Sequence, residues 1–507
     1  MMINPNSLAR RGIWRGLPWV IAGGLVLRLL VVMLTERSLH SDEIFQYVEQ
    51  AHRLTYGYGY VPWEYVHGLR NWLLPGAISL VLSGCRLLGL TDPALYIPVV
   101  QTLACLISLS AIYCAYLIGR TVCSESVGRL ASVLTAGWYE MVIRANAITP
   151  EIFGAYLLIG AIACLVIKPG YRSALLLGLC GAGAIALRLQ YAPAVAVVIV
   201  MALVYTWQGR WSRGQCLVAA VGFLAVIGLV GWLDDYTWGS YFVSYRNNYL
   251  YNRVYKVSSL WGEGPAWGYL ADLAMYSGGV FWVAIATSLF SRKPRPWLIL
   301  ALLASVVVPH SAIAHKEYRF IFAAVPICLL LSAFAIDALW TTSKEPATSA
   351  ARKRSQGRRN WGRFILGLMA FYTSGVLLVT SFFLDPQADQ LQAYLYLNDQ
   401  PELVSVLNLS SDWYHTGGYY YLHRDVPIYL PTHIDSLQAD EWARYVSHVV
   451  CDRDQAPIPE FTPVAQFGKL EIRAADRPPT ARLDVETRYP PQGGVDGVYT
   501  PRVTSRF

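Results

Sequence analysis

Charged side chains are scarce in this sequence. Asp, Glu, Lys and Arg make up 15% of its 507 residues, whereas apolar types make up 55%. Soluble globular domains carry about a quarter charged residues, so most of this chain is excluded from that class. The sequence also has no internal repeat, no Gly-rich phosphate loop and no heptad array, which excludes solenoids, phosphate-loop nucleotide binders and coiled coils. The composition therefore indicates a protein that lies in a bilayer.

The basic residues do not gather in one stripe. The net charge of +8 comes from Lys and Arg in short connections between apolar runs, which is typical of a positive-inside membrane protein, so no nucleic-acid partner is predicted. No disulfide is predicted within the polar C-terminal region, because Cys451 is its single cysteine. Arg10, Arg11 and Arg15 precede an apolar run that lacks a small-residue cleavage site, which predicts a retained signal anchor.

Long apolar runs mark the candidate membrane spans. A spanning helix needs about 17 to 20 mostly apolar residues. The sequence predicts about eleven spans, at 17–35, 95–118, 127–143, 151–167, 173–188, 190–206, 215–233, 271–290, 297–313, 320–340 and 361–384. Segment 73–90 contains Pro75 and Gly76 and is predicted as an interfacial or re-entrant helix pair.

The fold class that follows is a polytopic α-helical membrane protein with a small α/β domain. We expect a transmembrane catalytic domain at 1–384 and an extracytoplasmic soluble domain at 385–507, with its α/β part near 388–475 and an extended Pro-rich terminus. Lys and Arg in alternate connections place the N-terminus in the cytoplasm. The loops 36–94 and 234–270 then lie outside and hold most of the distinctive polar residues. The membrane remains open between a bacterial inner or plasma membrane and the endoplasmic reticulum.

The first cluster with chemical potential is His40-Ser41-Asp42-Glu43, just after the first span. Adjacent carboxylates at a water–lipid boundary have a raised pKa when burial and a like-charged neighbour disfavour ionisation. Asp42, with Glu43 as helper, is therefore a candidate general base for an acceptor hydroxyl. An ordinary interfacial helix cap is the competing interpretation.

Aromatic residues follow in the same loop. Tyr-rich sequence runs into Trp63, Glu64, His67 and Arg70, and aromatic faces with hydrogen-bonding neighbours suit the apolar faces and polar edges of sugar rings. Membrane anchoring would also place aromatic residues at the interface, but Glu64 and His67 favour a pocket.

The second cluster is His315-Lys316-Glu317-Tyr318-Arg319, between two apolar runs. His315, Lys316 and Arg319 are predicted to hold the phosphate of a lipid carrier, with Arg319 making a forked contact and Glu317 lining the pocket. Such a clamp would stabilise charge on a departing phosphate. A boundary charge cluster is the alternative, although the positive-inside rule places such clusters on the other face.

Further pocket residues come from shorter external connections and from the loop 234–270. Arg144, Asn146, Glu151 and Arg188 are polar residues beside membrane segments, which marks a functional site by default. Asp234 lies in a loop that is predicted mainly to cover the site. The acidic and His residues show no spacing that demands a metal. No cofactor is predicted, although a divalent cation is left open.

Taken in order, these residues resemble glycosyltransferase family 22, the Alg9-like enzymes of the GT-C fold, and above all the type that adds the third mannose of GPI anchors. The matching segments are His40-Ser41-Asp42-Glu43, Gly57 to Trp63-Glu64 with Gly68-Leu69-Arg70, Arg144 with Asn146 and Glu151, Asp234 with Gly239, Trp261-Gly262 with Pro265, and His315-Lys316-Glu317-Tyr318-Arg319-Phe320.

The resemblance implies an inverting transfer of a hexose, most simply mannose, from a polyprenyl (dolichyl-type) phosphate donor to a lipid-linked glycan, with Asp42 as base. The chain departs from the family pattern at Ser41, at Arg188-Leu189-Gln190 and at Ala266, which leaves sugar, linkage and acceptor open. Two other classes also remain: a lipid or glycan transporter, and a noncatalytic subunit with the same fold. Membrane lipids are expected partners, and the oligomeric state is open.

Overall fold

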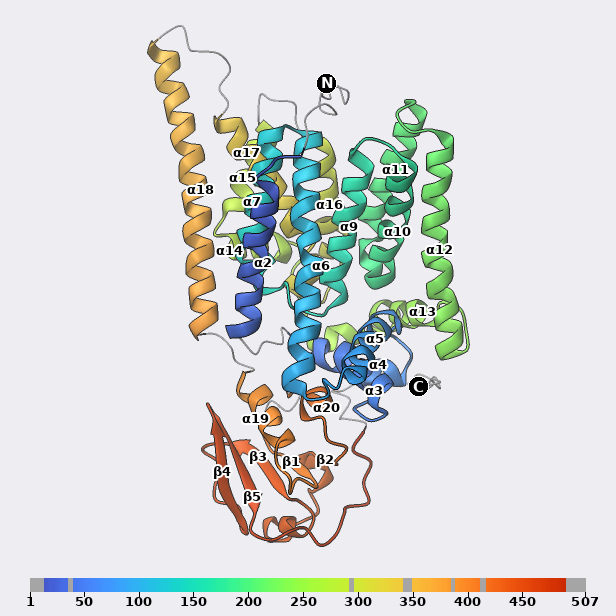
Figure 1. The fold of residues 1–507 in the computed structure, drawn as a ribbon, viewed down its shortest axis with the longest axis vertical. Helices are drawn as coiled ribbons and strands as arrows, with labels where there is room; N and C mark the ends of the chain where they lie inside the picture. The colour runs from blue at the N-terminus through green and yellow to red at the C-terminus, as the bar shows by residue number, and fades with distance from the viewer. Residues whose placement is uncertain are drawn as a thin grey trace.

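The computed structural model describes residues 13–34, 40–290, 296–340, 349–383, 388–410 and 416–488. These residues form a tall helical body with a small sheet-containing unit at its lower end (Figure 1). Expectations that rest on Arg10 and Arg11 or on the Pro-rich terminus beyond 488 lie outside the described residues.

Four helical runs in the described part are long and apolar enough to cross a membrane, or five if one bent pair counts as a span. The four are α2 (Leu17–Leu34), α6 (Pro93–Val122), the run Leu189–Trp207 formed by η2 and α11 (Ala192–Trp207), and α12 (Arg213–Trp238). Shorter apolar helices are α5 (Leu73–Leu87), α9 (Pro150–Val166), α10 (Tyr171–Leu187), α16 (Trp297–Ser311) and α17 (Ala324–Trp340). The number of about eleven spans stays a prediction.

Helix α17 forms the centre of the helical body. It is apolar on all sides and buried from Ala324 to Asp337, as expected for a helix surrounded by others. The long helix α18 (Ser349–Phe383) lies at the edge of the body (Figure 1).

Two predicted spans are interrupted. The run 271–290 divides into α14 (Gly268–Ser277) and α15 (Val280–Phe290), which meet at 107°. Gly278 and Gly279 between them have φ of 58° and 79°, a conformation that glycine adopts without strain. The run 127–143 divides into α7 (Glu125–Gly137) and α8 (Tyr139–Ile143), because Trp138 is extended. Continuous hydrophobicity concealed both breaks.

The segment 73–90 also differs from its prediction. It forms the single helix α5 rather than a helix pair, and Pro75 lies in the first turn, where its missing N–H breaks no helical hydrogen bond. The preceding part of the loop forms η1 (Glu43–Val48), α3 (Glu49–Tyr56) and α4 (Trp63–Val66). Loop 234–270 contributes α13 (Val243–Tyr249), η3 (Leu250–Val254) and η4 (Val257–Trp261). Helices α3, α4, α5 and α13 gather at the lower end of the body (Figure 1).

The C-terminal unit is a five-stranded mixed sheet with two helices, α19 (Ala388–Asn398) and α20 (Gly418–Leu422). The strand order is β2-β1-β3-β5-β4, with β1 parallel to β2 and β3, and β5 antiparallel to β3 and β4. The strands are β1 (Val406–Asn408), β2 (Ile428–Tyr429), β3 (His448–Asp452), β4 (Phe461–Phe467) and β5 (Leu470–Ala475). One buried apolar cluster contains Ile44 and Tyr60 of loop 36–94 together with Tyr394 and Leu422 of this unit. The unit therefore shares a core with the loop.

Candidate active site

The first polar cluster lies where the chain enters η1. Asp42 immediately precedes this helix, and its backbone N–H donates to the His40 imidazole Nδ1 at 3.2 Å. Helix η1 is a π-helix, a form that is rare and frequent at functional sites. The Asp42 side chain is 30% exposed, so it is accessible to a ligand while anchored near one end of loop 36–94.

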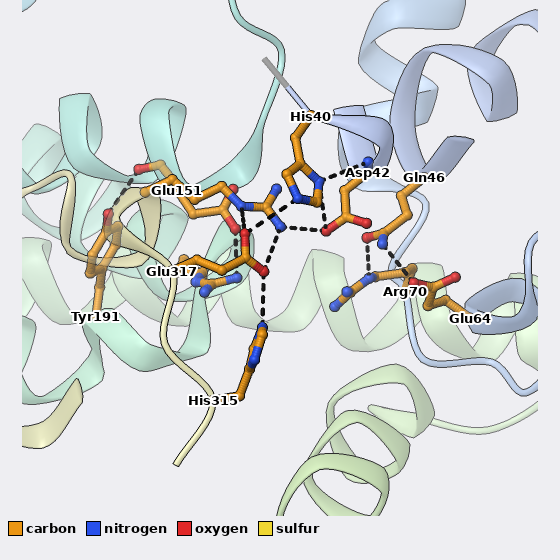
Figure 2. A network of polar contacts seen from close by, with 11 residues as sticks. His40, Asp42, Gln46, Glu64, Arg70, Glu151, Tyr191, His315 and Glu317 are labelled. Atoms are coloured by element: carbon orange, nitrogen blue, oxygen red, sulfur yellow. Dashed lines mark hydrogen bonds and ion pairs between the residues drawn. The ribbon is translucent and has the colours of Figure 1, made fainter. Parts of the chain in front are cut away.

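The second polar cluster, between α16 and η5 (Tyr318–Ile321), meets the first. The Arg319 Nη2 lies 2.5 Å from Asp42 Oδ2, a contact between segments 277 residues apart. The same guanidinium lies 2.6 Å from Glu317 through its Nε. Glu317 also contacts His315 at 3.0 Å and His40 at 3.5 Å, so acids and cations alternate in one network (Figure 2).

The charges of this network keep its carboxylates ionised. Burial by itself would raise the pKa of Asp42, but Arg319 and His40 lower the pKa below its ordinary value. The pKa of Glu317 is likewise lowered, because hydrogen bonds from His315 and Arg319 outweigh burial. An anion that drew Arg319 away from Asp42 would raise the Asp42 pKa and make this carboxylate a stronger base.

A second ion pair lies beside the network. Glu151 opens α9, and its Oε1 is 2.7 Å from Arg188 Nη1. The Arg188 guanidinium lies over the Phe320 ring at 4.3 Å, next to Arg319 in the chain. The Tyr191 hydroxyl donates to the Glu151 backbone carbonyl at 2.9 Å, which fixes the turn that carries Arg188 (Figure 2).

Several buried polar atoms in this region find no hydrogen-bond partner among the described residues. They are Arg144 Nε, Asn146 Nδ2, Glu151 Oε2 and Arg188 Nε. Buried polar groups are almost always paired, and unpaired ones accompany functional sites or missing water. The four predicted residues therefore offer hydrogen bonds to a polar ligand.

A third arrangement joins Arg70, Gln46 and Glu64. The Gln46 amide accepts from Arg70 Nε at 2.7 Å and donates to Glu64 Oε1 at 2.6 Å (Figure 2). Burial raises the Glu64 pKa to about 7, although Arg70 opposes the rise. A cavity of about 70 Å³ opens here, and both Arg70 and Arg188 line it.

Lys316 does not share the surroundings of Arg319. Its ammonium donates to the backbone carbonyls of Ser311, at 3.2 Å, and of Ile313, and lies 5.6 Å from the centre of the Tyr269 ring. The predicted phosphate clamp therefore divides: Arg319 and His315 lie in the network, and Lys316 is directed into its own loop.

Glu43 points away from Asp42. Its Oε1 accepts from the Ile148 N–H at 2.7 Å, and its side chain is buried. This geometry differs from the expectation of two neighbouring carboxylates acting together, because successive residues in a helix leave it in directions about 100° apart. Glu43 instead connects the first loop to the segment between α8 and α9.

The remaining predicted residues lie in contacts between the two loops. Trp63 stacks on Trp261 at 5.7 Å, and the His67 ring lies 5.3 Å from Tyr251. Asp234 accepts hydrogen bonds from Asn71 and from the backbone and hydroxyl of Ser244. These contacts hold loop 234–270 against the first loop.

Two contributors were not singled out from the sequence. Gln46 lies one helical turn beyond Asp42, a spacing that was available as a signal, since residues four apart share a helix face. Asn71 lines the cavity and donates to Asp234 at 2.5 Å, and no local pattern identifies it. Among the described residues, no three His, Cys, Asp or Glu side chains are placed to hold a metal ion.

Comparisons with known proteins show which family the chain resembles. A model of the Alg9-like mannosyltransferase family matches residues 19–423. The chain is 27% identical over 430 residues to GPI mannosyltransferase 3 of Yarrowia lipolytica, covering 80% of this chain and 75% of that protein. It is 23% identical over 450 residues to mannosyltransferase APTG1 of Arabidopsis thaliana, with the same coverages.

A solved structure shows the same fold. ArnT from Cupriavidus metallidurans, crystallised with undecaprenyl phosphate, superposes with a TM-score of 0.58 over 94% of this chain and 99% of that one. The sequence identity is 14%, so this likeness concerns the GT-C fold alone.

Proposed function

Because the chain belongs to the Alg9-like mannosyltransferase family, and is therefore a membrane glycosyltransferase, we propose that it moves mannose from a polyprenyl phosphate donor to a lipid-linked glycan. The transfer takes place at the extracytoplasmic surface, where the two external loops and the C-terminal unit meet. The contact between Asp42 and Arg319 is the observation that carries this proposal. It supports the assignment of Asp42 as the base and of Arg319 as the phosphate-binding cation, because the two side chains are in contact.

The reaction we propose is one displacement at the anomeric carbon. The acceptor oxygen forms a bond to that carbon while the bond to the phosphate oxygen breaks, with its electron pair leaving on the phosphate. The acceptor proton passes to Asp42, and the configuration of the sugar inverts. Arg319 stabilises the negative charge that develops on the phosphate.

The ion pair between Asp42 and Arg319 suits this sequence of events. Asp42 and the donor phosphate compete for Arg319, because both are anions and the guanidinium offers a forked set of donors. Binding of the phosphate would weaken the hold of Arg319 on Asp42 and raise its pKa. Glu317 and His315 would keep Arg319 in place during the exchange.

The sugar and the acceptor are assigned to the polar groups around the cavity. Arg70 and Arg188 line its wall, and Glu151, whose Oε2 has no hydrogen-bond partner in the described part of the chain, is ion-paired with Arg188. The Asn146 Nδ2 is a further buried atom without a partner among the described residues. Hydroxyl groups both donate and accept hydrogen bonds, so they can satisfy the unpaired amide nitrogen and the carboxylate oxygen together.

The test is a product analysis with purified protein. Candidate polyprenyl phosphate sugars and a glycolipid extract are incubated with the wild type, and products are identified by mass spectrometry. We expect a hexose adduct from a mannose donor. Asp42→Asn should lower kcat by at least about 100-fold, by analogy with lost acid–base catalysis, while donor binding is retained. Asp435→Asn, in an exposed part of the C-terminal unit, is the matched control.

Two outcomes would contradict the proposal. Full activity of Asp42→Asn would remove Asp42 from the mechanism. Movement of the donor lipid across the membrane without any glycosylated product would indicate a transporter instead.

A further inference from the structure

A buried carboxylate outside the active site connects the catalytic loop to the C-terminal unit. Glu49 is the first residue of α3, directly after the π-helix, and is 0% exposed. Its Oε1 accepts from the Tyr60 N–H at 2.7 Å, and its Oε2 accepts from the Tyr420 N–H at 2.9 Å. Tyr420 lies in α20, 371 residues further along the chain. We call this set, with Gly59 and Gly418, the Glu49 bridge.

Two glycines shape the backbone around this carboxylate. A Cβ on Gly59 would lie 2.9 Å from Glu49 Oε1, and a Cβ on Gly418 would lie 2.7 Å from Oε2. Both glycines have positive φ, at 147° and 57°. One comes from the external loop and the other from the C-terminal unit, so both segments leave room for the same side chain.

Other contacts strengthen the same junction. The His52 and His423 imidazoles meet at 3.0 Å, and the Tyr96 hydroxyl donates to the Tyr420 carbonyl. On the loop side, the Gln50 amide donates to the Phe45 carbonyl at 2.7 Å. Phe45 lies inside the π-helix, so the junction is tied directly to the segment that begins at Asp42.

From this geometry we infer that the C-terminal unit is a positioning element for catalysis: through the Glu49 bridge, α20 holds the π-helix so that Asp42 stays in contact distance of Arg319. This inference rests on the proposed function. A π-helix is a rare form that occurs mostly as a short segment and is frequent at functional sites, so the contacts that hold this one in place matter for the site. A shift of about 1 Å in a catalytic group can lower the rate about 100-fold, so the support matters for rate. Neither Glu49 nor Tyr420 contacts the network around Asp42, and their effect is transmitted through the helix.

The experiment compares two glycine substitutions. Gly418→Ala places a methyl group against Glu49, whereas Gly57→Ala is the matched control, because Gly57 also has positive φ (89°) but has open space around its Cβ position. Glu49→Gln is a second variant that keeps the shape of the side chain and turns one acceptor into a donor facing an N–H group. Each variant is studied as the full-length protein in detergent or lipid.

Two quantities are measured: the hydrogen–deuterium exchange of residues 43–56 and the kinetics of transfer. We expect Gly418→Ala and Glu49→Gln to increase exchange in 43–56, and to lower kcat between about tenfold and 100-fold. The donor KM should stay within about twofold and exchange in α17 should not change, while Gly57→Ala should resemble the wild type. Any other pattern overturns the inference, in particular faster exchange with an unchanged kcat, or a general loss of protection that includes α17.

The exchange measurement needs no substrate, which separates this inference from the proposed function. If the wild-type protein transfers no sugar while Gly418→Ala increases exchange in 43–56, the proposed function fails although the bridge still holds the π-helix. Normal transfer by Gly418→Ala and Glu49→Gln would contradict only the role of the bridge.

Discussion

The separation of Arg319 from Lys316 leads to a prediction that distinguishes two cations three residues apart. Arg319 lies in the acid network, 2.5 Å from Asp42 and 2.6 Å from Glu317, whereas the Lys316 ammonium is directed to backbone carbonyls of its own loop. Arg319→Ala should therefore impair transfer far more than Lys316→Ala. Composition gives no reason to expect this difference, because both residues are basic and both lie in the same segment.

The size of the effect follows from the contacts. Removing one donor that stabilises a developing oxyanion costs about 2.7–4 kcal/mol, or about 100-fold to 1,000-fold in kcat. Loss of Lys316 breaks a loop contact worth about 1 kcal/mol, so roughly a fivefold effect is the upper limit. Arg319→Ala should lower stability only modestly, by about 1–2 kcal/mol, because Asp42 and Glu317 are 30% and 25% exposed and water can replace part of the lost contact.

The assay is steady-state transfer with donor and acceptor varied separately. For Arg319→Ala, kcat and the kcat/KM for the donor should fall together, since the lost interaction is strongest in the transition state. Arg319→Lys keeps the charge without the forked geometry and should give an intermediate rate. A thermal melt of each variant shows that the protein is folded at the assay temperature.

Two results would refute this reasoning. If Lys316→Ala lowered kcat as much as Arg319→Ala, Lys316 would bind the donor phosphate as well. If Arg319→Ala changed only the response to the acceptor, Arg319 would not be the ligand of the donor phosphate.

Two further predictions concern carboxylates around the site. Glu43→Gln should keep kcat within about threefold of the wild type, because the amide oxygen still accepts a hydrogen bond from the Ile148 N–H. The net contribution of such a bond is only about 1 kcal/mol. A loss of kcat as large as that of Asp42→Asn in the same assay would restore Glu43 as a catalytic partner. Burial raises the pKa of Glu64 from 4.5 to about 7, so its contribution to stability is present below pH 4.5 and is lost as the pH rises through about 7. The melting temperature should fall between pH 5 and pH 8, by less in Glu64→Gln, and an equal fall in both proteins would contradict the assignment.

Much of the site could be located from the sequence. The acidic cluster at Asp42 and the cationic cluster at Arg319 were found because each concentrates unusual residue types beside an apolar run. The choice of the same external side for both followed from the charges of the connections. Their contact agrees with the expectation that the two clusters lie close together in space.

The sequence was less informative about direction and pairing. It predicts that Glu43 helps Asp42 and that Lys316 helps Arg319, because neighbours in sequence are expected to be neighbours in space. The π-helix directs Glu43 to Ile148, and the loop directs Lys316 to Ser311 and Ile313. Gln46 was overlooked although its helical spacing from Asp42 was visible.

By itself, then, the sequence determined that this chain is a membrane protein, where its unusual polar clusters lie and which family it resembles, because hydropathy and residue type are local properties. Only the tertiary structure decided that Arg319 meets Asp42, that the run 271–290 bends by 107°, and that the carboxylate of Glu49 lies between Tyr60 and Tyr420. Those outcomes depend on packing between segments far apart in the chain and on the direction in which each side chain leaves its helix. Neither is encoded in the pattern of a single segment.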